Sequence, residues 1–256
     1  MKVSIITVCF NSAKTIRDAI ESVLSQNYTD IEYIIVDGAS KDSTLSIVGE
    51  YASRIAKVIS EPDRGIYDAM NKGIAAATGD IIGILNSDDF YESNDAIAYL
   101  VHQFARFPKA DLIYGDVVFC KVEDTKAVTR TYRASHFRSW KLRFGWMPPH
   151  PATFMRRRAY ELVGAYSLDY KISADYEIFV RMLYSNKLNY RWVNKVIVRM
   201  RQGGVSTSGI KSSLLLNREI VKACKNNGLY TNLAFVLTKI PFKFLEFISL
   251  SRWQKK

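Results

Sequence analysis

Short apolar runs alternate with amphipathic segments through the first 120 residues, and this alternation restricts the fold more than any other feature of the chain. Apolar and β-branched residues predict strands at residues 2–10, 31–40, 56–63, 80–85 and 111–119. Helical spacing of apolar residues predicts helices after Asn11 or Ser12 and at residues 42–52, 64–79 and 94–107. Strands that alternate with helices form βαβ units, so we expect an α/β fold with a mainly parallel sheet flanked by helices.

Several predicted strands end at an aspartate. Asp37, Asp63 and the pair Asp88–Asp89 each follow such a strand. In parallel sheets, ligands bind at the carboxyl ends of the strands. We therefore expect these carboxylates to lie along one edge of the sheet.

The pattern loosens after residue 120. Residues 129–143 contain five basic residues and no acid, and the last forty or so residues are predicted to be helical, basic and rich in aromatic residues. Repeats and a linker between independent domains are both absent from the sequence. We predict a domain at 1–208, with halves at 1–120 and 121–208, followed by basic amphipathic helices at 209–256.

Charge is divided unevenly between the two parts of the chain. Residues 1–100 hold 8 Lys and Arg against 15 Asp and Glu, whereas residues 101–256 hold 28 against 10. A basic region suits nucleic acid, an anionic membrane or a phosphorylated substrate. Nucleic acid is the poorest match, because the acidic half would repel phosphates and the basic half has neither a helix-turn-helix nor an RNP pattern.

The Asp88–Asp89 pair has a chemical interpretation beyond that of a single aspartate. One aspartate at a strand end is usually a turn former or a helix cap. Two adjacent carboxylates disfavour each other's ionisation, and a bound cation removes that cost. Mg²⁺ and Mn²⁺ prefer oxygen ligands and often bind one or two carboxylates together with substrate phosphates. The pair therefore predicts a metal–diphosphate site, while the missing G-x-x-x-x-G-K-[ST] motif argues against P-loop enzymes.

Six ordered motifs together resemble family 2 glycosyltransferases of the GT-A fold. They are "VSIITVCFN", "IIVDGASKDST", "SEPDRGIYDAMNKGIAAATGDIIGILNSDD", "HPATFMRR", "SADYEIFVRM" and "QGGVS". The resemblance covers residues 1 to about 208 and is strongest to bacterial enzymes that build O-antigen, capsule and exopolysaccharide. It implies a Rossmann-like mixed, mainly parallel sheet.

The resemblance implies a nucleotide-sugar site made of residues from the first three of these motifs. Its members would be Thr7, Val8, Asp37, Asp63, Arg64, Asn71, Lys72 and Asp88. Asp37 would contact the pyrimidine, and Asp88 the ribose or donor sugar. Asp89 would bind Mn²⁺ or Mg²⁺ directly, although Asn86 stands where the family's D-x-D motif has its first Asp.

The resemblance also assigns the catalytic base to Asp175, in "SADYE". A carboxylate that balances the dipole at a helix start is the structural alternative. We expect an ordinary Asp pKa of about 4 for this base. His150 and Arg156 are weaker candidates for contacts with the acceptor or the diphosphate.

The implied reaction is transfer of a hexose from a UDP-sugar with inversion at the anomeric carbon. UDP-glucose and UDP-galactose are the preferred donors. The acceptor would be a sugar on undecaprenyl diphosphate, in surface polysaccharide synthesis. A dTDP-sugar donor and a sugar-nucleotide nucleotidyltransferase are the alternatives. We expect a cytoplasmic protein, peripheral at the inner face of the inner membrane if the C-terminal helices lie in the interface rather than packing on the domain.

Overall fold

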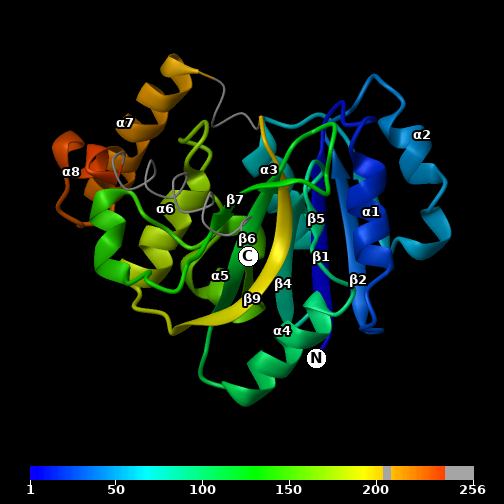
Figure 1. Ribbon diagram of the computed structural model, residues 1–256, viewed down its shortest axis with the longest axis horizontal. Coiled ribbons are helices and arrows are strands. Elements are labelled where there is room, and N and C mark those ends of the chain that lie inside the picture. The colour runs from blue at the N-terminus through cyan, green and yellow to red at the C-terminus, as the bar shows by residue number, and fades with distance from the viewer. Residues whose placement is uncertain (204–208, 240–256) are drawn as a thin grey trace.

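A computed structural model of the protein describes residues 1–203 and 209–239. Its centre is a sheet that runs in the order β3-β2-β1-β4-β8-β6-β9-β5, with β7 paired to β6 (Figure 1). The strands are β1 (Val3–Cys9), β2 (Ile31–Asp37), β3 (Lys57–Ser60), β4 (Ile81–Asn86), β5 (Phe90–Tyr91), β6 (Leu112–Cys120), β7 (Val128–Tyr132), β8 (Thr153–Arg156) and β9 (Tyr190–Arg201). The predicted α/β class and mixed, mainly parallel sheet are confirmed.

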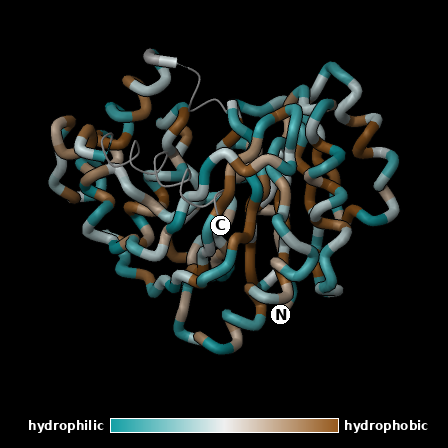
Figure 2. The backbone as a smooth tube through the Cα atoms, in the orientation of Figure 1, coloured by the Kyte–Doolittle hydropathy of each residue, from teal (hydrophilic) through white to brown (hydrophobic). Residues whose placement is uncertain are grey.

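Helices cover both faces of this sheet. They are α1 (Ile16–Leu24), α2 (Thr44–Gly49), α3 (Ile66–Ala76), α4 (Ala96–Arg106), α5 (Arg157–Val163), α6 (Ala174–Val180), α7 (Ile210–Asn226) and α8 (Leu233–Leu237). Short helical turns are η1 (Ala52–Arg54), η2 (Ser139–Phe144), η3 (His150–Ala152) and the π-helical η4 (Arg181–Ser185). Apolar side chains of α1, α2 and α4 pack on one face, and those of α3, α5, α6, α7 and α8 lie in the cluster on the other. Figure 2 shows hydrophobic residues concentrated along the central strands.

Parallel pairing aligns the carboxyl ends of four strands. Cys9 lies opposite Asp37, Asp37 lies opposite Ser60, and Asn86 lies opposite Val8. We call the place where β1, β2, β3 and β4 end the carboxyl edge. Its position is fixed by hydrogen-bond register, because a slip of one residue would turn every buried side chain to the other face.

Three short strands were not predicted. β5 has two residues, and β7 and β8 pair antiparallel to β6, where no alternation with helices marks them. β8 also pairs antiparallel to β4 and places Phe154 beside Gly83. A Cβ on Gly83 would lie 2.6 Å from the Phe154 ring, so this glycine permits the close approach.

The C-terminal helices pack on the domain as far as they are described. α7 contacts α6, α8 contacts α7 and η2, and Ala223, Cys224 and Val236 are fully buried. Residues 240–256, which carry much of the predicted membrane-binding segment, lie outside the described residues. Within the two described ranges, no helix has the length and apolar character needed to cross a bilayer.

Candidate active site

Asp37 and Asp63 meet at the carboxyl edge in different environments. Asp37 is fully buried, and its Oδ2 accepts hydrogen bonds from the Ser60 hydroxyl at 2.8 Å and the Ser40 backbone N–H at 3.0 Å. Asp63 is partly exposed, and its Oδ1 accepts from the Gly65 N–H at 2.8 Å. Asp37 therefore shapes the turn after β2, while Asp63 keeps an accessible carboxylate above it.

A glycine brings Asp63 to this place. A Cβ on Gly38 would lie 2.4 Å from the Asp63 Oδ2 and 3.4 Å from the Phe10 ring. The first distance would force the Asp63 carboxylate to shift, whereas the second is an ordinary van der Waals contact. Phe10, whose side chain is largely exposed, thus stands beside Asp63 as an open aromatic surface.

Thr7 and Val8 lie on β1 below the edge and are both buried. The Thr7 hydroxyl accepts a hydrogen bond from the Tyr33 hydroxyl at 3.1 Å. Val8 belongs to the apolar cluster under α3. These two residues build the floor of the carboxyl edge rather than its surface.

The predicted site residues on and just before α3 differ in their exposure and in their hydrogen bonds. Arg64 is exposed and pairs with Asp68 at 3.4 Å. The Lys72 Nζ binds the Pro62 carbonyl oxygen at 2.8 Å. The Asn71 amide donates to the Tyr166 carbonyl oxygen and accepts from the Tyr166 N–H, each at 2.8 Å. Asn71 therefore ties α3 to the loop before α6.

Asp88 and Asp89 follow β4 with unequal exposure. Asp88 is partly exposed, whereas Asp89 is buried and its Oδ2 accepts from the Asn86 Nδ2 at 3.2 Å. Burial, followed by the Asp88 charge, raises the pKa of Asp89 well above its usual range, and burial also raises the pKa of Asp88. A cation at this pair would reverse both shifts.

Arg201, at the end of β9, lies against this pair and was not predicted as a site residue. It is buried, donates to the Asp88 backbone carbonyl oxygen at 2.8 Å and also bonds to Asp18. Its charge lowers the pKa of both Asp88 and Asp89. The arginine offsets part of the carboxylate charge and holds the Asp88 backbone in place.

The chemistry of this corner fits a divalent cation shared with a substrate. The buried Asn86 Oδ1 has no hydrogen-bond partner among the residues that the structure describes, which leaves a neutral oxygen available as a metal ligand beside two carboxylates. Among the described residues, no group of three or more His, Cys, Asp and Glu side chains could bind a metal. A site with two carboxylates and one amide oxygen suits Mg²⁺ or Mn²⁺ when diphosphate oxygens complete the ligand set.

Asp175 lies in the first turn of α6, away from the Asp88–Asp89 pair in sequence and in its contacts. Its Oδ1 accepts from the Tyr176 N–H at 2.8 Å and the Tyr67 hydroxyl at 3.2 Å. Burial raises the pKa of Asp175 to about 6, with both hydrogen bonds opposing the rise. The expectation of an ordinary pKa was wrong because the sequence does not show this desolvation, yet the group is still largely ionised at pH 7.

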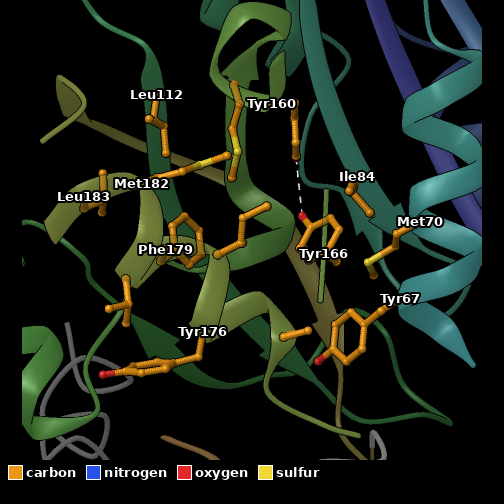
Figure 3. Packing of buried hydrophobic residues seen from close by; sticks show 14 of the residues in the cluster. Tyr67, Met70, Ile84, Leu112, Tyr160, Tyr166, Tyr176, Phe179, Met182 and Leu183 are labelled. Atoms are coloured by element: carbon orange, nitrogen blue, oxygen red, sulfur yellow. Dashed lines mark hydrogen bonds between the residues drawn. The ribbon is translucent and has the colours of Figure 1, made fainter. Parts of the chain in front are cut away.

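Aromatic rings support the position of Asp175. The Tyr67 ring stacks on Tyr166 with centroids 5.8 Å apart, and the Tyr166 hydroxyl bonds to the His150 Nε2 at 2.7 Å. Figure 3 shows Tyr67, Tyr160 and Tyr166 grouped beside α3. His150 is buried, and burial lowers its pKa to about 4, so it is neutral at pH 7. His150 therefore contacts the stack through Tyr166.

Arg156 lies at the opposite edge of the sheet. It pairs with Ile81, the first residue of β4, and its guanidinium donates to the Ala110 and Phe104 carbonyl oxygens at 2.9 and 3.1 Å. The structure therefore does not bring Arg156 together with the other candidates. Its hydrogen bonds anchor α4 to β8 instead.

Phe10, Tyr67 and Arg201 join the site although the sequence reasoning did not select them. Phe10 directly follows β1, and Tyr67 stands inside the quoted motif "EPDRGIYDAMNKG". A place next to a strand end, or inside a motif, could have identified both residues from the sequence. Arg201 precedes the quoted "QGGVS", but only the pairing of β9 with β6 brings it to the carboxyl edge.

Fold and candidate site together define an α/β protein with aspartates gathered at the carboxyl edge of its sheet and a further carboxylate, Asp175, at the start of α6. Residues 4–163 match the model of Glycosyl transferase family 2. The chain belongs to this family and is a glycosyltransferase. Asp175 lies beyond the matched residues.

Curated relatives agree with this assignment. A PGL/p-HBAD biosynthesis glycosyltransferase of Mycobacterium bovis is 29% identical over 223 residues, which cover 83% of this chain and 82% of the relative. An uncharacterized glycosyltransferase of Mycobacterium tuberculosis is 32% identical over 181 residues, covering 70% and 68%.

Solved structures share the fold. S. aureus TarS 1–349 in complex with UDP-GlcNAc has a TM-score of 0.67 and 19% identity, with 90% of this chain and 68% of that chain covered. The match spans 41% of a longer TarS chain. A Pyrobaculum calidifontis mannosyltransferase in complex with GDP-Man and Mn²⁺ has a TM-score of 0.64 and 20% identity, covering 88% and 63%.

Proposed function

We propose that the protein is an inverting glycosyltransferase that transfers a hexose from a UDP-sugar to a sugar linked to a lipid diphosphate in surface polysaccharide synthesis. One observation carries the proposal. The first turn of α3 contacts both halves of the site, because Asp63 bonds to Gly65 at its start and Tyr67 donates to Asp175. A donor nucleotide at the carboxyl edge would therefore end near a carboxylate of raised pKa.

Asp175 acts in this proposal as the general base. It accepts the proton of the acceptor hydroxyl while that oxygen attacks the anomeric carbon, and the nucleoside diphosphate leaves with the electrons of the broken bond. The Tyr67 hydroxyl holds one carboxylate oxygen and leaves the other free to accept the proton. Direct displacement of an α-linked donor would give a β-linked product.

Asp88 and Asp89 act at the leaving group. Together with the Asn86 Oδ1 they would hold Mn²⁺ or Mg²⁺, which supplies Lewis-acid stabilisation of the departing diphosphate. Asp88 is the exposed member and so is placed to meet the diphosphate first, with Asp89 behind it. The resemblance instead assigns the metal to Asp89 and the ribose or donor sugar to Asp88, and single variants can separate the two assignments.

The donor is proposed to carry a pyrimidine nucleotide. Phe10 offers an exposed ring for stacking beside Asp63, and TarS, which shares this fold, was solved with UDP-GlcNAc and with UDP. UDP-glucose and UDP-galactose are the first donors to test, with dTDP-sugars as the alternative. Family membership decides against the nucleotidyltransferase alternative.

The acceptor is proposed to be an undecaprenyl-diphosphate-linked sugar at the cytoplasmic face of the inner membrane. Four large side chains on η2 and beside or on α8 are exposed, namely Trp140, Tyr230, Leu233 and Leu237. Lys141 lies 5.7 Å from the Trp140 ring centroid. Aromatic and apolar side chains with basic neighbours suit an anionic membrane surface. Binding to phosphatidylglycerol vesicles that high salt reverses is expected.

A UDP-release assay tests the proposal. The purified protein is given a panel of UDP- and dTDP-sugars with a sugar-diphosphate-lipid acceptor, with Mn²⁺ or with chelator. We expect release with one donor, dependent on acceptor and metal. Release that ignores the acceptor, or that survives chelation unchanged, would contradict the assigned roles.

A further inference from the structure

The buried carboxylate of Glu219, on α7, accepts three hydrogen bonds from consecutive residues. Its Oε1 accepts from the Lys171 N–H at 2.8 Å, and its Oε2 accepts from the Ile172 N–H at 3.1 Å and the Ser173 hydroxyl at 2.9 Å. We call residues 171–173 the base loop, because α6 and Asp175 follow it directly. α7 and α6 lie against each other in the structure (Figure 1).

The backbone N–H groups of Lys171 and Ile172 and the Ser173 hydroxyl all donate to this one carboxylate. Ser173 is the N-cap residue of α6 and is fully buried, but its side chain makes no capping bond to the helix. The hydroxyl that would ordinarily accept from an α6 N–H donates to Glu219 instead. The start of α6 is thus fixed from a different helix, distant in the sequence.

We propose that Glu219 is a positioning residue for Asp175. The inference rests on the proposed function, in which Asp175 is the base. Asp175 follows Ser173 by two residues, so a shift of the base loop moves its carboxylate relative to the acceptor hydroxyl. Misplacing a catalytic group by about 1 Å can cost on the order of 100-fold in rate. α7 would therefore support the position of Asp175 through Glu219.

Glu219→Gln is the sharpest variant, because it keeps the shape of the side chain. One of its two polar atoms becomes an NH₂ group, which cannot accept a hydrogen bond. The variant therefore loses either the bond from the Lys171 N–H or those from the Ile172 N–H and the Ser173 hydroxyl, depending on which way the amide is turned. Ile220→Val is the matched control. Ile220 is the next residue of α7, buried in the apolar cluster, and its side chain carries no polar atom to bond to the base loop.

Two measurements test the role. The first is hydrogen exchange of the backbone amides in residues 170–176, which needs no substrate. The second is steady-state kinetics with the donor that the release assay selects. For Glu219→Gln we expect faster exchange in the base loop, a kcat lower by roughly 10- to 100-fold, and a donor KM equal to that of the wild type. Ile220→Val is expected to lower Tm while kcat stays unchanged.

The outcomes separate this inference from the proposed function. Exchange in Glu219→Gln that matches the wild type would overturn the inference, whatever the kinetics. Faster exchange with unchanged kcat would overturn it too, as would equal losses of kcat in Glu219→Gln and Ile220→Val. If the wild type transfers no sugar, the proposed function fails, and exchange alone decides whether Glu219 positions Asp175.

Discussion

The Asp88–Asp89 corner and the Asp175 site use the same side chain in opposite ways. At the corner, two adjacent carboxylates, one partly exposed and one buried, each have a pKa raised by burial, and the Asp88 charge raises the pKa of Asp89 further. At Asp175, one carboxylate is desolvated alone and keeps two hydrogen-bond donors that favour its ionised form. The first arrangement is suited to accept a cation, and the second to accept a proton.

The two regions also differ in what supports them. The corner stands on β4 and is held by Arg201 of β9, so strand register places it. Asp175 is placed by side chains of α3 and α7 that contact α6 and its loop. Loss of a single side chain should therefore disturb the geometry at Asp175 more readily than the geometry of the corner.

The largest effect is expected from Asp175→Asn. The amide cannot accept the acceptor's proton, and a general base contributes roughly 10²- to 10⁴-fold, so kcat should fall by about that factor. UDP affinity, measured by calorimetry, should remain that of the wild type. Equal loss of turnover and of UDP binding would contradict separate roles for the two regions.

Glu177→Gln is the control for that variant. Glu177 lies two residues further along α6, and its carboxylate pairs with Arg181 at 2.7 Å. Turnover should stay close to that of the wild type while Tm falls. A loss of turnover as large as that of Asp175→Asn, at a temperature where the variant is folded, would move the base to Glu177.

Asp88→Asn and Asp89→Asn come next in size. Removing a metal ligand should abolish the gain in UDP affinity that Mn²⁺ provides. Loss of a residue that only supports a metal ligand typically costs roughly 10- to 100-fold in metal affinity, and we expect a larger loss here. The exposure of Asp88 predicts the larger loss in Asp88→Asn. Calorimetric titrations of UDP with Mn²⁺ and with chelator measure it, and an unchanged Mn²⁺ response in both variants would place the metal elsewhere.

A smaller effect is expected at Tyr67. The hydroxyl stabilises ionised Asp175, so Tyr67→Phe should raise the pKa of Asp175 further and move the acid limb of kcat/KM, near pH 6 in the wild type, to higher pH. Activity at pH 7 should fall about 2- to 15-fold, since hydrogen bonds to charged groups are worth about 1.5–3 kcal/mol, or about 1–2 pKa units. Tyr160→Phe is the control, because the Tyr160 hydroxyl contacts Tyr166 and not Asp175. A profile unchanged by Tyr67→Phe would show that the Tyr67 bond has no influence on the base.

The same carboxylate gives a dependence of stability on pH. Because the folded pKa of Asp175, about 6, lies above its unfolded value, the protonated group stabilises the fold. This contribution is fully present below about pH 4 and is lost as the pH rises through about 6. Asp175→Asn should therefore flatten the change in Tm between pH 4 and 6. Identical Tm profiles for variant and wild type would exclude the raised pKa.

The smallest effect is expected at Gly38. A Cβ there would displace the end of the Asp63 side chain, so Gly38→Ala should weaken UDP binding by only a few-fold and leave the Mn²⁺ response intact. Gly49→Ala is the matched control, because its added Cβ meets no atom within 4 Å. Equal UDP affinity in the two variants would remove Asp63 from the nucleotide site.

The sequence is most informative in the βαβ units of the first 120 residues. Hydrophobic alternation and strand-end aspartates predict Asp37, Asp63, Asp88 and Asp89 at one edge of the sheet. β8 was missed because an antiparallel strand of four residues has no periodic pattern. Arg156 was expected near the site, yet its strand runs antiparallel to β4 and places it at the far edge.

Side-chain partners from distant segments were beyond the sequence. Glu219 resembles any other charged residue of an amphipathic helix until α7 is seen against the base loop. The raised pKa of Asp175 likewise results from burial under rings that meet only in three dimensions. Local patterns therefore predict the position of the Asp88–Asp89 pair, whereas the surroundings of Asp175 depend on tertiary contacts.

The anomeric configuration of the product tests the central claim most directly. If Asp175 is a base and the corner holds the leaving diphosphate, the acceptor oxygen attacks the sugar directly. Proton NMR of the purified product from an α-linked UDP-glucose or UDP-galactose should then show the large H1–H2 coupling of a β-linkage. The small coupling of an α-linkage would mean retention, and Asp175 could not be the base of a single displacement.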